Sequence, residues 1–380
     1  MAARQPVHGP SESASTRFRK DCSLSHTGRR VRRTRDGAGS LDDGVAQKVV
    51  GGFGRTLERL RIRWGAIVSG LVRDRVAGAL VGLAAGDALG AGYEFGSAPD
   101  GDADMIGGGL GPWEPGEWTD DTQMAICIAA VTAQGPLDPV AVGERFLAWL
   151  RSDPPDVGIS TRAVLGGART GAELLQAARD YLVAHPKGGA GNGALMRTAP
   201  VALAHLGDDE EIAVSARTVA ELTHADPLAG DSCVLWCIAV DRAVREGRLD
   251  GVWDGLALLP DERRDRWRGL VEQAETDPTT TFTPNGFTVT ALQAAHSAIT
   301  QTPVPDEGPA ERHLVDALQA AVHIGDDTDT VAAIAGALLG ARWGASAVPI
   351  RWRRMLHGWP GMDADDLERL ALRTAGLGGR

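Results

Sequence analysis

The stretch GDDTDTVAAIAGALLGAR, residues 325–342, places acidic and hydroxyl side chains directly before a long alanine-rich apolar segment. Asp and Thr are favoured at the first residues of helices, and the apolar residues recur at helical spacing. The pattern predicts a helix over about 328–342. WTDDTQMAICIAAVTA at 118–133 repeats it, which predicts a helix that begins near Thr119 or Asp120 and ends at Gly135-Pro136.

The same helical spacing continues on both sides of these stretches. It begins at about Leu71, with apolar residues at Val76, Leu80, Leu83 and neighbouring positions, and a loop rich in Gly, Pro and Asp follows over 92–116. Further helices are expected at 138–151, 160–171, 173–184, from Ala194, and at 208–224, 227–247, 262–274, 286–299, 310–323 and 363–375. Because period-two alternation is almost absent, we predict an all-α, compact multi-helix domain.

Composition and charge divide the chain unequally. The 380 residues are 43% hydrophobic and carry a net charge of -11, which argues against a general nucleic-acid surface. Residues 1–63 nevertheless hold 14 Lys and Arg against 6 Asp and Glu, a net of +8, which leaves 25 against 44, or -19, in the remainder. We predict a disordered basic extension over 1–70 and the helical domain over 71–380. The run from Arg29 to Arg33 could form a nucleic-acid-binding arm, but a solvated tail or an upstream start codon explains it more simply.

The four cysteines predict no disulfide framework in a chain of this length. Cys233 and Cys237 lie one helical turn apart in an apolar stretch and are expected to be buried thiols.

We find no secretory segment at the start and no apolar run of the ~18 residues that span a bilayer. A cytoplasmic monomer without a membrane partner is therefore expected.

The two acidic helix starts are candidates for a metal site. One cap needs one side chain, whereas each cluster supplies two or three carboxylates. Two carboxylates about 4 Å apart repel by about 4 kcal/mol at an effective dielectric of ~20, so four of them need a cation if the clusters meet. Oxygen ligands suit Mg²⁺ or Mn²⁺, and a pair of ions roughly 3.5–4 Å apart would use this many carboxylates. Simple capping of two separate helices remains the alternative at this point.

Three other features are weaker by themselves. KGGAGNG at 187–193 could bring backbone N–H groups close to a phosphate, although an ordinary glycine-rich turn has the same composition. Glu94 by itself would pass for a surface residue. His224 would be favoured at the end of a helix without any further role.

In this order, five segments resemble the ADP-ribosylglycohydrolase family. They are GLAAGDALGAGYEFG, WTDDTQMA, GNGALMRTAPVAL, LTHADP and GDDTDTVAAIAGALLGARWG, which together span about residues 74–345. The resemblance implies an all-helical fold with two Mg²⁺ ions, or Mn²⁺, in a central cleft.

Residue by residue, the resemblance implies metal ligands, catalytic groups and substrate contacts. The implied ligands are Thr119, Asp120, Asp121, Asp327, Asp329 and Thr330; the implied catalytic groups are Asp120 and Glu94; the implied substrate contacts are Gly191, Asn192, Gly193 and His224. Asp326 falls at a variable position and is not expected to be a ligand. The implied reaction is hydrolysis of the bond between ADP-ribose and an acceptor on a protein or small molecule. Gly189 and Ala190 replace hydroxyl or aromatic residues of other members, which leaves the acceptor open.

Two other functions fit parts of this pattern. An all-α isoprenoid diphosphate enzyme would need an Asp-Asp-x-x-Asp pattern, and Met124 stands where its last aspartate would be. A non-catalytic ADP-ribose-binding relative would be recognised by lost metal ligands, and none is missing from the sequence.

Overall fold

The computed structural model describes residues 69–186 and 188–378. They belong to one compact unit. The prediction for the N-terminal extension lies outside the described residues, apart from residues 69 and 70, which already belong to the first helix.

Helices make up nearly all of the regular structure of the described residues. After the first helix at 69–90 come the 3₁₀ turn η1 (Ala91–Tyr93), α2 (Asp120–Thr132), α3 (Pro139–Arg151), α4 (Ile159–Gly166), η2 (Gly171–Glu173), α5 (Leu174–Ala184), η3 (Asn192–Ala194), α6 (Ala199–Ala204), α7 (Asp209–Glu221), α8 (Pro227–Glu246), α9 (Val252–Gly255), η4 (Leu256–Leu258), α10 (Asp261–Thr276), η5 (Thr279–Thr281), α11 (Thr288–Gln301), η6 (Ala310–Arg312), α12 (His313–His323), α13 (Thr328–Trp343), η7 (Ala345–Ala347), α14 (Ile350–Met355) and α15 (Ala364–Thr374). Two short antiparallel strands, β1 (His357–Gly358) and β2 (Met362–Asp363), form a hairpin. The all-α prediction is confirmed.

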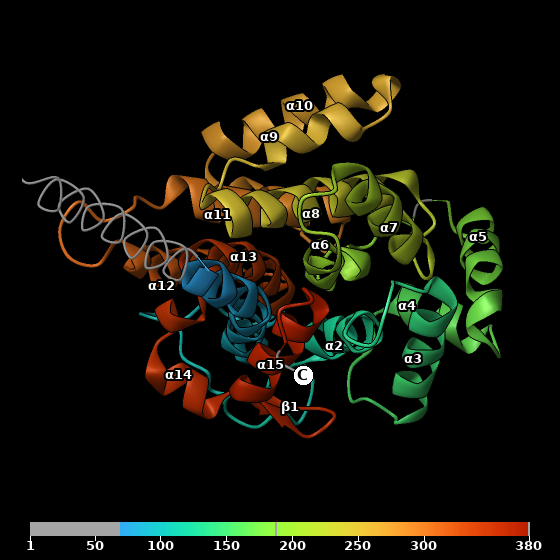
Figure 1. Ribbon diagram of the computed structural model, residues 1–380, viewed down its shortest axis with the longest axis horizontal. Helices are drawn as coiled ribbons and strands as arrows, with labels where there is room; N and C mark the ends of the chain where they lie inside the picture. The colour runs from blue at the N-terminus through green and yellow to red at the C-terminus, as the bar shows by residue number, and fades with distance from the viewer. Residues whose placement is uncertain (1–68, 187, 379–380) are drawn as a thin grey trace, which may run out of the picture. The chain divides into compact units, whose positions relative to one another are not determined.

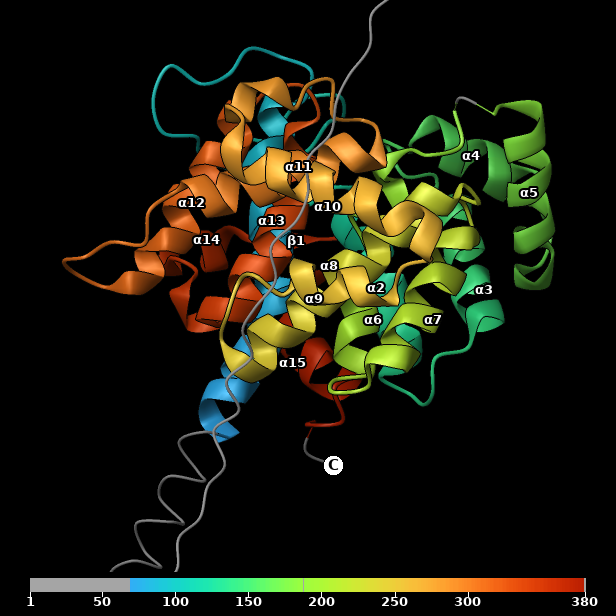
Figure 2. The ribbon, with the colours of Figure 1, turned by 90° about the horizontal axis from the view of Figure 1, so that it is seen from above.

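Helix α13 lies at the centre of the packing. It contacts α8, α11 and α12 directly, and α10 lies on the outer side of α11 (Figure 1). Helices α3, α4 and α5 form a group at one end, which contacts the rest through α2 and α7, and the view from above shows the same group (Figure 2). Residues 328–341 of α13 are all buried, which agrees with the absence of polar side chains from Val331 to Ala341.

Glycines bring the first helix and α13 into backbone contact. Gly78, Gly82, Gly86 and Gly90 recur every four residues along one face of the first helix. A Cβ on Gly82 would overlap the carbonyl oxygen of Gly336, and one on Gly86 would overlap that of Ala332. Gly90 lies against the backbone of Asp329 in the same way. This contact fixes how the first helix lies over the start of α13.

The first helix departs from one sequence expectation. The segment Ser69–Tyr93 contains an 18-residue window with a mean hydropathy of 1.3, which is long and apolar enough to cross a membrane by composition. However, 89% of that window is buried inside the protein, the environment of a core helix.

Some predicted boundaries were wrong for local reasons. The helix expected over 160–171 ends at Gly166, because Gly167 and the residues after it form a turn before η2. The helix expected from 286 begins at Thr288, because the Thr288 N–H donates to the carbonyl of Ala190. The short helices α9 and α14 were not predicted, since four to six residues show too little periodicity.

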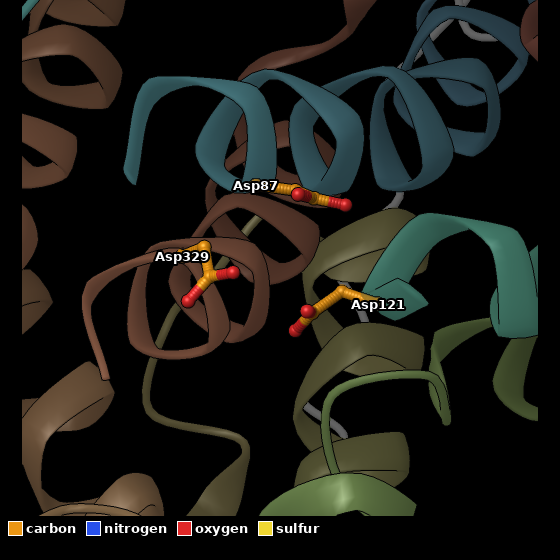
Figure 3. A group of neighbouring side chains, drawn as sticks. All are labelled: Asp87, Asp121 and Asp329. Atoms are coloured by element: carbon orange, nitrogen blue, oxygen red, sulfur yellow. The ribbon is translucent and has the colours of Figure 1, made fainter. Parts of the chain in front are cut away.

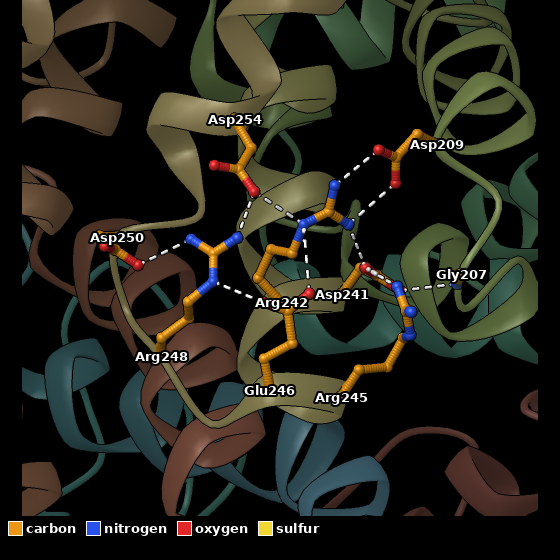
Figure 4. Close-up of polar contacts among 9 residues, drawn as sticks. All are labelled: Gly207, Asp209, Asp241, Arg242, Arg245, Glu246, Arg248, Asp250 and Asp254. Atoms are coloured by element: carbon orange, nitrogen blue, oxygen red, sulfur yellow. Dashed lines mark hydrogen bonds and ion pairs between the residues drawn. The ribbon is translucent and has the colours of Figure 1, made fainter. Parts of the chain in front are cut away.

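An ion-pair network joins α7, α8 and α9 (Figure 4). Arg242 donates through both terminal nitrogens to Asp209, at 2.8 and 2.6 Å, and through Nε to Asp254 at 2.8 Å. It also contacts Asp241, whose side chain is fully buried. The network therefore holds one buried carboxylate and links three helices.

We expect Arg242→Ala to lower the free energy of unfolding by about 2 kcal/mol, because it removes one of the two charge partners of the buried Asp241 and leaves only Arg245, whereas the outer carboxylates can turn to water. Urea unfolding followed by circular dichroism measures the change. Arg268→Ala is the control, since Arg268 is exposed and 4.0 Å from its partner Asp265. Equal stabilities for the two variants would show that the network contributes nothing beyond surface charge.

Candidate functional site

A cavity of about 600 Å³ opens between the start of α13, the start of α2 and the loop before η3. Its wall combines carboxylates, among them Glu94, Asp120, Asp156 and Asp329, with glycines and apolar side chains. The described residues that line it include no Lys or Arg. A ligand that carries negative charge would therefore need backbone N–H groups, neutral donors or a bound cation.

The two acidic helix starts meet at the floor of this cavity. The Thr119 hydroxyl lies 3.1 Å from Oδ2 of Asp121 and 3.4 Å from Oδ2 of Asp329, although 210 positions separate Thr119 from Asp329. Glu94, Asp327 and Asp329 each offer an oxygen within 4.8 Å of the other two. The side chains of both helix starts are buried, so capping of two separate helices does not describe them.

Asp87, which sequence reasoning missed, completes a second group with Asp121 and Asp329. Figure 3 shows these three carboxylates coming from three different helices. Asp87 Oδ1 accepts from the Thr119 N–H at 2.9 Å and its hydroxyl at 2.8 Å, and Oδ2 accepts from the Thr122 N–H at 3.0 Å and its hydroxyl at 2.6 Å. With these four hydrogen bonds Asp87 holds the first turn of α2 in place. Because the Thr119 hydroxyl donates its proton to Asp87, the lone pairs of the Thr119 oxygen stay free for another partner.

The carboxylates at the cavity floor are too crowded to be ionised together without a cation. Burial, and then the neighbouring carboxylates, raise the pKa of Asp121 and of Asp329 well above the usual range. The same causes raise the pKa of Glu94 to about 9. Asp121 Oδ1 and Glu94 Oε2 are buried without a hydrogen-bond partner among the described residues. Unpartnered buried oxygens in an all-oxygen donor set fit a hard divalent cation.

The Gly-Asn-Gly loop forms the adjoining wall. Asn192 donates through Nδ2 to Asp327 Oδ2 at 2.7 Å, and the Asn192 N–H donates to the carbonyl of Gly286 at 3.1 Å. Asn285, also missed from the sequence, is fully buried and accepts from the Asp327 N–H at 2.9 Å. The loop and the second acidic cluster are thus held by shared hydrogen bonds.

Asp326 points away from the cluster, as expected for a residue that is not a ligand. Its φ of 67° is left-handed, and its Oδ2 accepts from the Asn285 N–H at 2.8 Å. This conformation lets Asp326 and Asp327 face opposite ways although they are adjacent.

The structure brings all of the sequence-predicted site residues to one place. Those that line the cavity are Glu94, Asp120, Gly191, Asn192, Gly193, His224, Asp327, Asp329 and Thr330. Thr119 and Asp121 lie directly behind this wall, within reach of Asp329. Their roles stay predictions. Asp87 had one sequence signal, an acid within the apolar stretch at 76–90, whereas Asn285 follows a proline in an ordinary turn.

Comparisons with known proteins agree with this arrangement. The ADP-ribosylglycohydrolase family model matches residues 69–380. The chain is 30% identical over 292 residues to the ADP-ribosyl-dinitrogen reductase glycohydrolase of Rhodospirillum rubrum, covering 74% of this chain and 90% of that protein. It is 31% identical over 291 residues to the ADP-ribosylarginine hydrolase Tri1 of Pseudomonas putida (strain GB-1), covering 73% of each, and 28% identical over 289 residues to the human ADP-ribosylhydrolase ARH3, covering 67% of this chain and 78% of that protein.

The fold is shared as well. A solved structure of an ADP-ribosylglycohydrolase-related protein complex superimposes with a TM-score of 0.61 at 29% identity, covering 81% of this chain and 99% of that one. Because the family model spans every described helix, including those that carry the acidic clusters, the chain belongs to the ADP-ribosylglycohydrolase family of hydrolases acting on glycosyl bonds.

Proposed function

We propose that this protein is a Mg²⁺-dependent hydrolase that releases ADP-ribose from modified proteins. The observation that carries the proposal is the meeting of two acidic helix starts, far apart in the sequence, at the floor of a cavity lined by the Gly-Asn-Gly loop. Tri1 acts by its name on ADP-ribosylarginine, and the Rhodospirillum rubrum relative on ADP-ribosylated dinitrogen reductase. A protein acceptor, with arginine tested first, is the corresponding proposal here. Action as a monomer in the cytoplasm is part of the same proposal.

The proposed metal centre uses the oxygen atoms of the two clusters. Thr119, Asp120 and Asp121 would hold it from α2, and Asp327, Asp329 and Thr330 from α13. Two Mg²⁺ ions, or Mn²⁺ in their place, would neutralise the carboxylates and lower the pKa of a bound water. The unpartnered oxygens of Asp121 and Glu94 support this assignment, because buried polar atoms normally have a partner.

In the proposed reaction a water oxygen bonds to the anomeric carbon of ADP-ribose. The bond from that carbon to the acceptor breaks, and its electron pair leaves with the acceptor, which takes up a proton. Asp120 is the candidate to accept the water proton, because it lines the cavity from the first turn of α2. Glu94 is the other candidate, since it lines the cavity beside Asp327 and Asp329.

The test is a panel of four substrates. They are a protein or peptide ADP-ribosylated on arginine, a peptide ADP-ribosylated on serine, an ADP-ribosylated oligonucleotide, and O-acetyl-ADP-ribose. Each is incubated with Mg²⁺, with Mn²⁺ and with EDTA. We expect release of free ADP-ribose from the arginine-linked protein substrate and loss of release in EDTA. If the protein binds ADP-ribose but turns over none of these substrates, it is a non-catalytic ADP-ribose-binding protein and the hydrolase proposal is wrong. If EDTA leaves the rate of turnover unchanged, the proposed metal dependence is wrong.

The pKa shifts predict how Mg²⁺ stabilises the fold as pH changes. Without a cation the pKa of Glu94 is about 9 in the folded protein, against about 4.3 when unfolded. Between these values the folded state binds more protons, so the cation-free protein loses stability as pH rises. A fixed Mg²⁺ concentration of about 100 times the Kd at pH 6 should add about 2.7 kcal/mol at that pH and more at pH 8, where fewer protons compete for the carboxylates. Thermal unfolding with and without Mg²⁺ measures this, and a shift that shrinks as pH rises contradicts it.

Asp87 provides a separate test, because it supports the ligands without lining the cavity. Asp87→Asn exchanges one acceptor oxygen for an NH₂ group that faces the donors of Thr119 or Thr122. We expect Mg²⁺ to bind about 10- to 100-fold more weakly, the usual loss on changing a residue that orients metal ligands. Calorimetric titration measures the affinity, with Asp316→Asn on α12 as the control. Unchanged affinity would restrict Asp87 to a role in folding.

A further inference from the structure

A buried arginine lies behind the histidine of the cavity wall. Arg197 follows the Gly-Asn-Gly loop and has no exposed side-chain surface. Its guanidinium stands 4.4 Å from the centre of the Phe146 ring, and its Nη2 donates to the Thr223 hydroxyl at 2.5 Å. Its Nε has no hydrogen-bond partner among the described residues. Burying a charged side chain costs free energy unless it is hydrogen-bonded, and the bond to Thr223 is therefore important for Arg197.

The Thr223 hydroxyl links Arg197 to His224, because it contacts both side chains. Its oxygen lies 2.8 Å from Nδ1 of His224, and Thr223 is itself buried. Arginine can only donate, so the Thr223 oxygen accepts from Arg197 and its own proton needs another acceptor. Nδ1 of His224 is the only acceptor within reach among the described residues. A proton on Nδ1 would leave the Thr223 proton buried without a partner, which is unfavourable.

The ring of His224 therefore carries its proton on Nε2, the nitrogen on the cavity side. A Cβ placed on Gly191 would lie 3.2 Å from this Nε2, and one on Gly193 would lie 3.4 Å from it. No described residue forms a hydrogen bond with Nε2, and His224 lines the cavity. Burial and the charge of Arg197 lower the pKa of His224 to about 3, so the ring is neutral at pH 7.

We infer that Arg197 and Thr223 are positioning residues that fix His224 as an Nε2–H donor to a phosphate or hydroxyl oxygen of bound ADP-ribose. The identity of the ligand in this inference rests on the proposed function. The direction of the hydrogen bonds follows from the contacts of Arg197, Thr223 and His224 alone. It accounts for a charged side chain buried behind a cavity wall that itself has no Lys or Arg among the described residues. His224 then recognises the ligand and transfers no proton.

The experiment combines ¹⁵N NMR of the histidine rings with measurement of ADP-ribose binding. The protein contains nine histidines, so His224 is assigned by comparison with His224→Gln. In the ligand-free protein we expect Nε2 to carry the proton and Nδ1 to have none. Thr223→Val removes the hydroxyl at constant shape and should give a mixture of both ring forms and about tenfold weaker ADP-ribose binding, the loss of one hydrogen bond. Thr223→Ser should recover both properties.

The outcomes separate this inference from the proposed function. A wild-type ring with the proton on Nδ1 would overturn it, whether or not Thr223→Val folds. A Thr223→Val protein with the wild-type ring form and affinity would overturn it too. A merely structural Thr223 would lower the unfolding temperature of the valine variant and leave its ring form unchanged. If the ring form and ADP-ribose binding behave as expected but no substrate is hydrolysed, only the hydrolase proposal fails.

Discussion

Asp329→Asn is expected to lower kcat/KM for the ADP-ribosylated substrate by at least about a thousandfold, or about 4 kcal/mol of transition-state stabilisation. Asp329 belongs to both groups of clustered carboxylates, one with Asp87 and Asp121 and the other with Glu94 and Asp327. Asparagine keeps the shape but removes the charge that would hold the proposed cations. Initial rates at saturating Mg²⁺ and calorimetric titration of Mg²⁺ measure the two effects.

Asp326→Asn is the matched control, because it makes the same chemical change three residues earlier. The Asp326 carboxylate accepts from the Asn285 N–H, and an asparagine oxygen can accept that bond as well. We expect a kcat/KM within about threefold of the wild type, as for a charge outside the reacting groups. Wild-type activity in Asp329→Asn would rule out the metal mechanism, and equal losses in both variants would point to damage of the loop.

Gly340→Ala is expected to destabilise the protein by about 3 kcal/mol, the upper end for an added methyl group in a packed core. The new Cβ would overlap the carbonyl oxygen of Gly78, and backbone atoms cannot turn aside as a side chain can. The first helix and α13 must therefore move apart. Chemical denaturation measures the loss, and Mg²⁺ affinity should fall with it because Asp87 and Asp329 lie on these two helices.

Gly269→Ala tests the same substitution where space is open. Gly269 lies inside α10, and a Cβ there would meet no atom within 4 Å. Alanine is the better helix former by about 1 kcal/mol, so this variant should be more stable than the wild type. A Gly340→Ala protein that gains stability to the same degree would show that the close contact of the two helices is not a constraint.

The sequence predicted the helices well where long segments carry a periodic apolar pattern. The starts of α2 and α13 were placed correctly because Asp and Thr mark helix N-termini. The end of α4 was misplaced, since the glycines at 166 and 167 were read as part of the helix. Short elements such as α14 depend on tertiary contacts more than on their own residues.

The candidate site was only partly accessible from the sequence. Composition alone could not say that Asp121 and Asp329 lie side by side, and the resemblance to a known family supplied that step. Asp87 looked like an exception in an apolar helix, because its four donors belong to another helix. The relay from Arg197 through Thr223 to His224 depends on hydrogen-bond directions, which appear only once the fold has brought these residues together.

The glycine contact between the first helix and α13 also limits how the site can exchange its contents. Main-chain atoms meet there from Gly78 to Gly90, so these helices cannot part without separating a closely fitted surface. The cavity lies on the other side of the acidic cluster, where Glu94, which follows the short turn η1, forms part of the wall. The site is thus one-sided: backbone closes it at the rear, and the cavity is the side from which a ligand can approach the carboxylates.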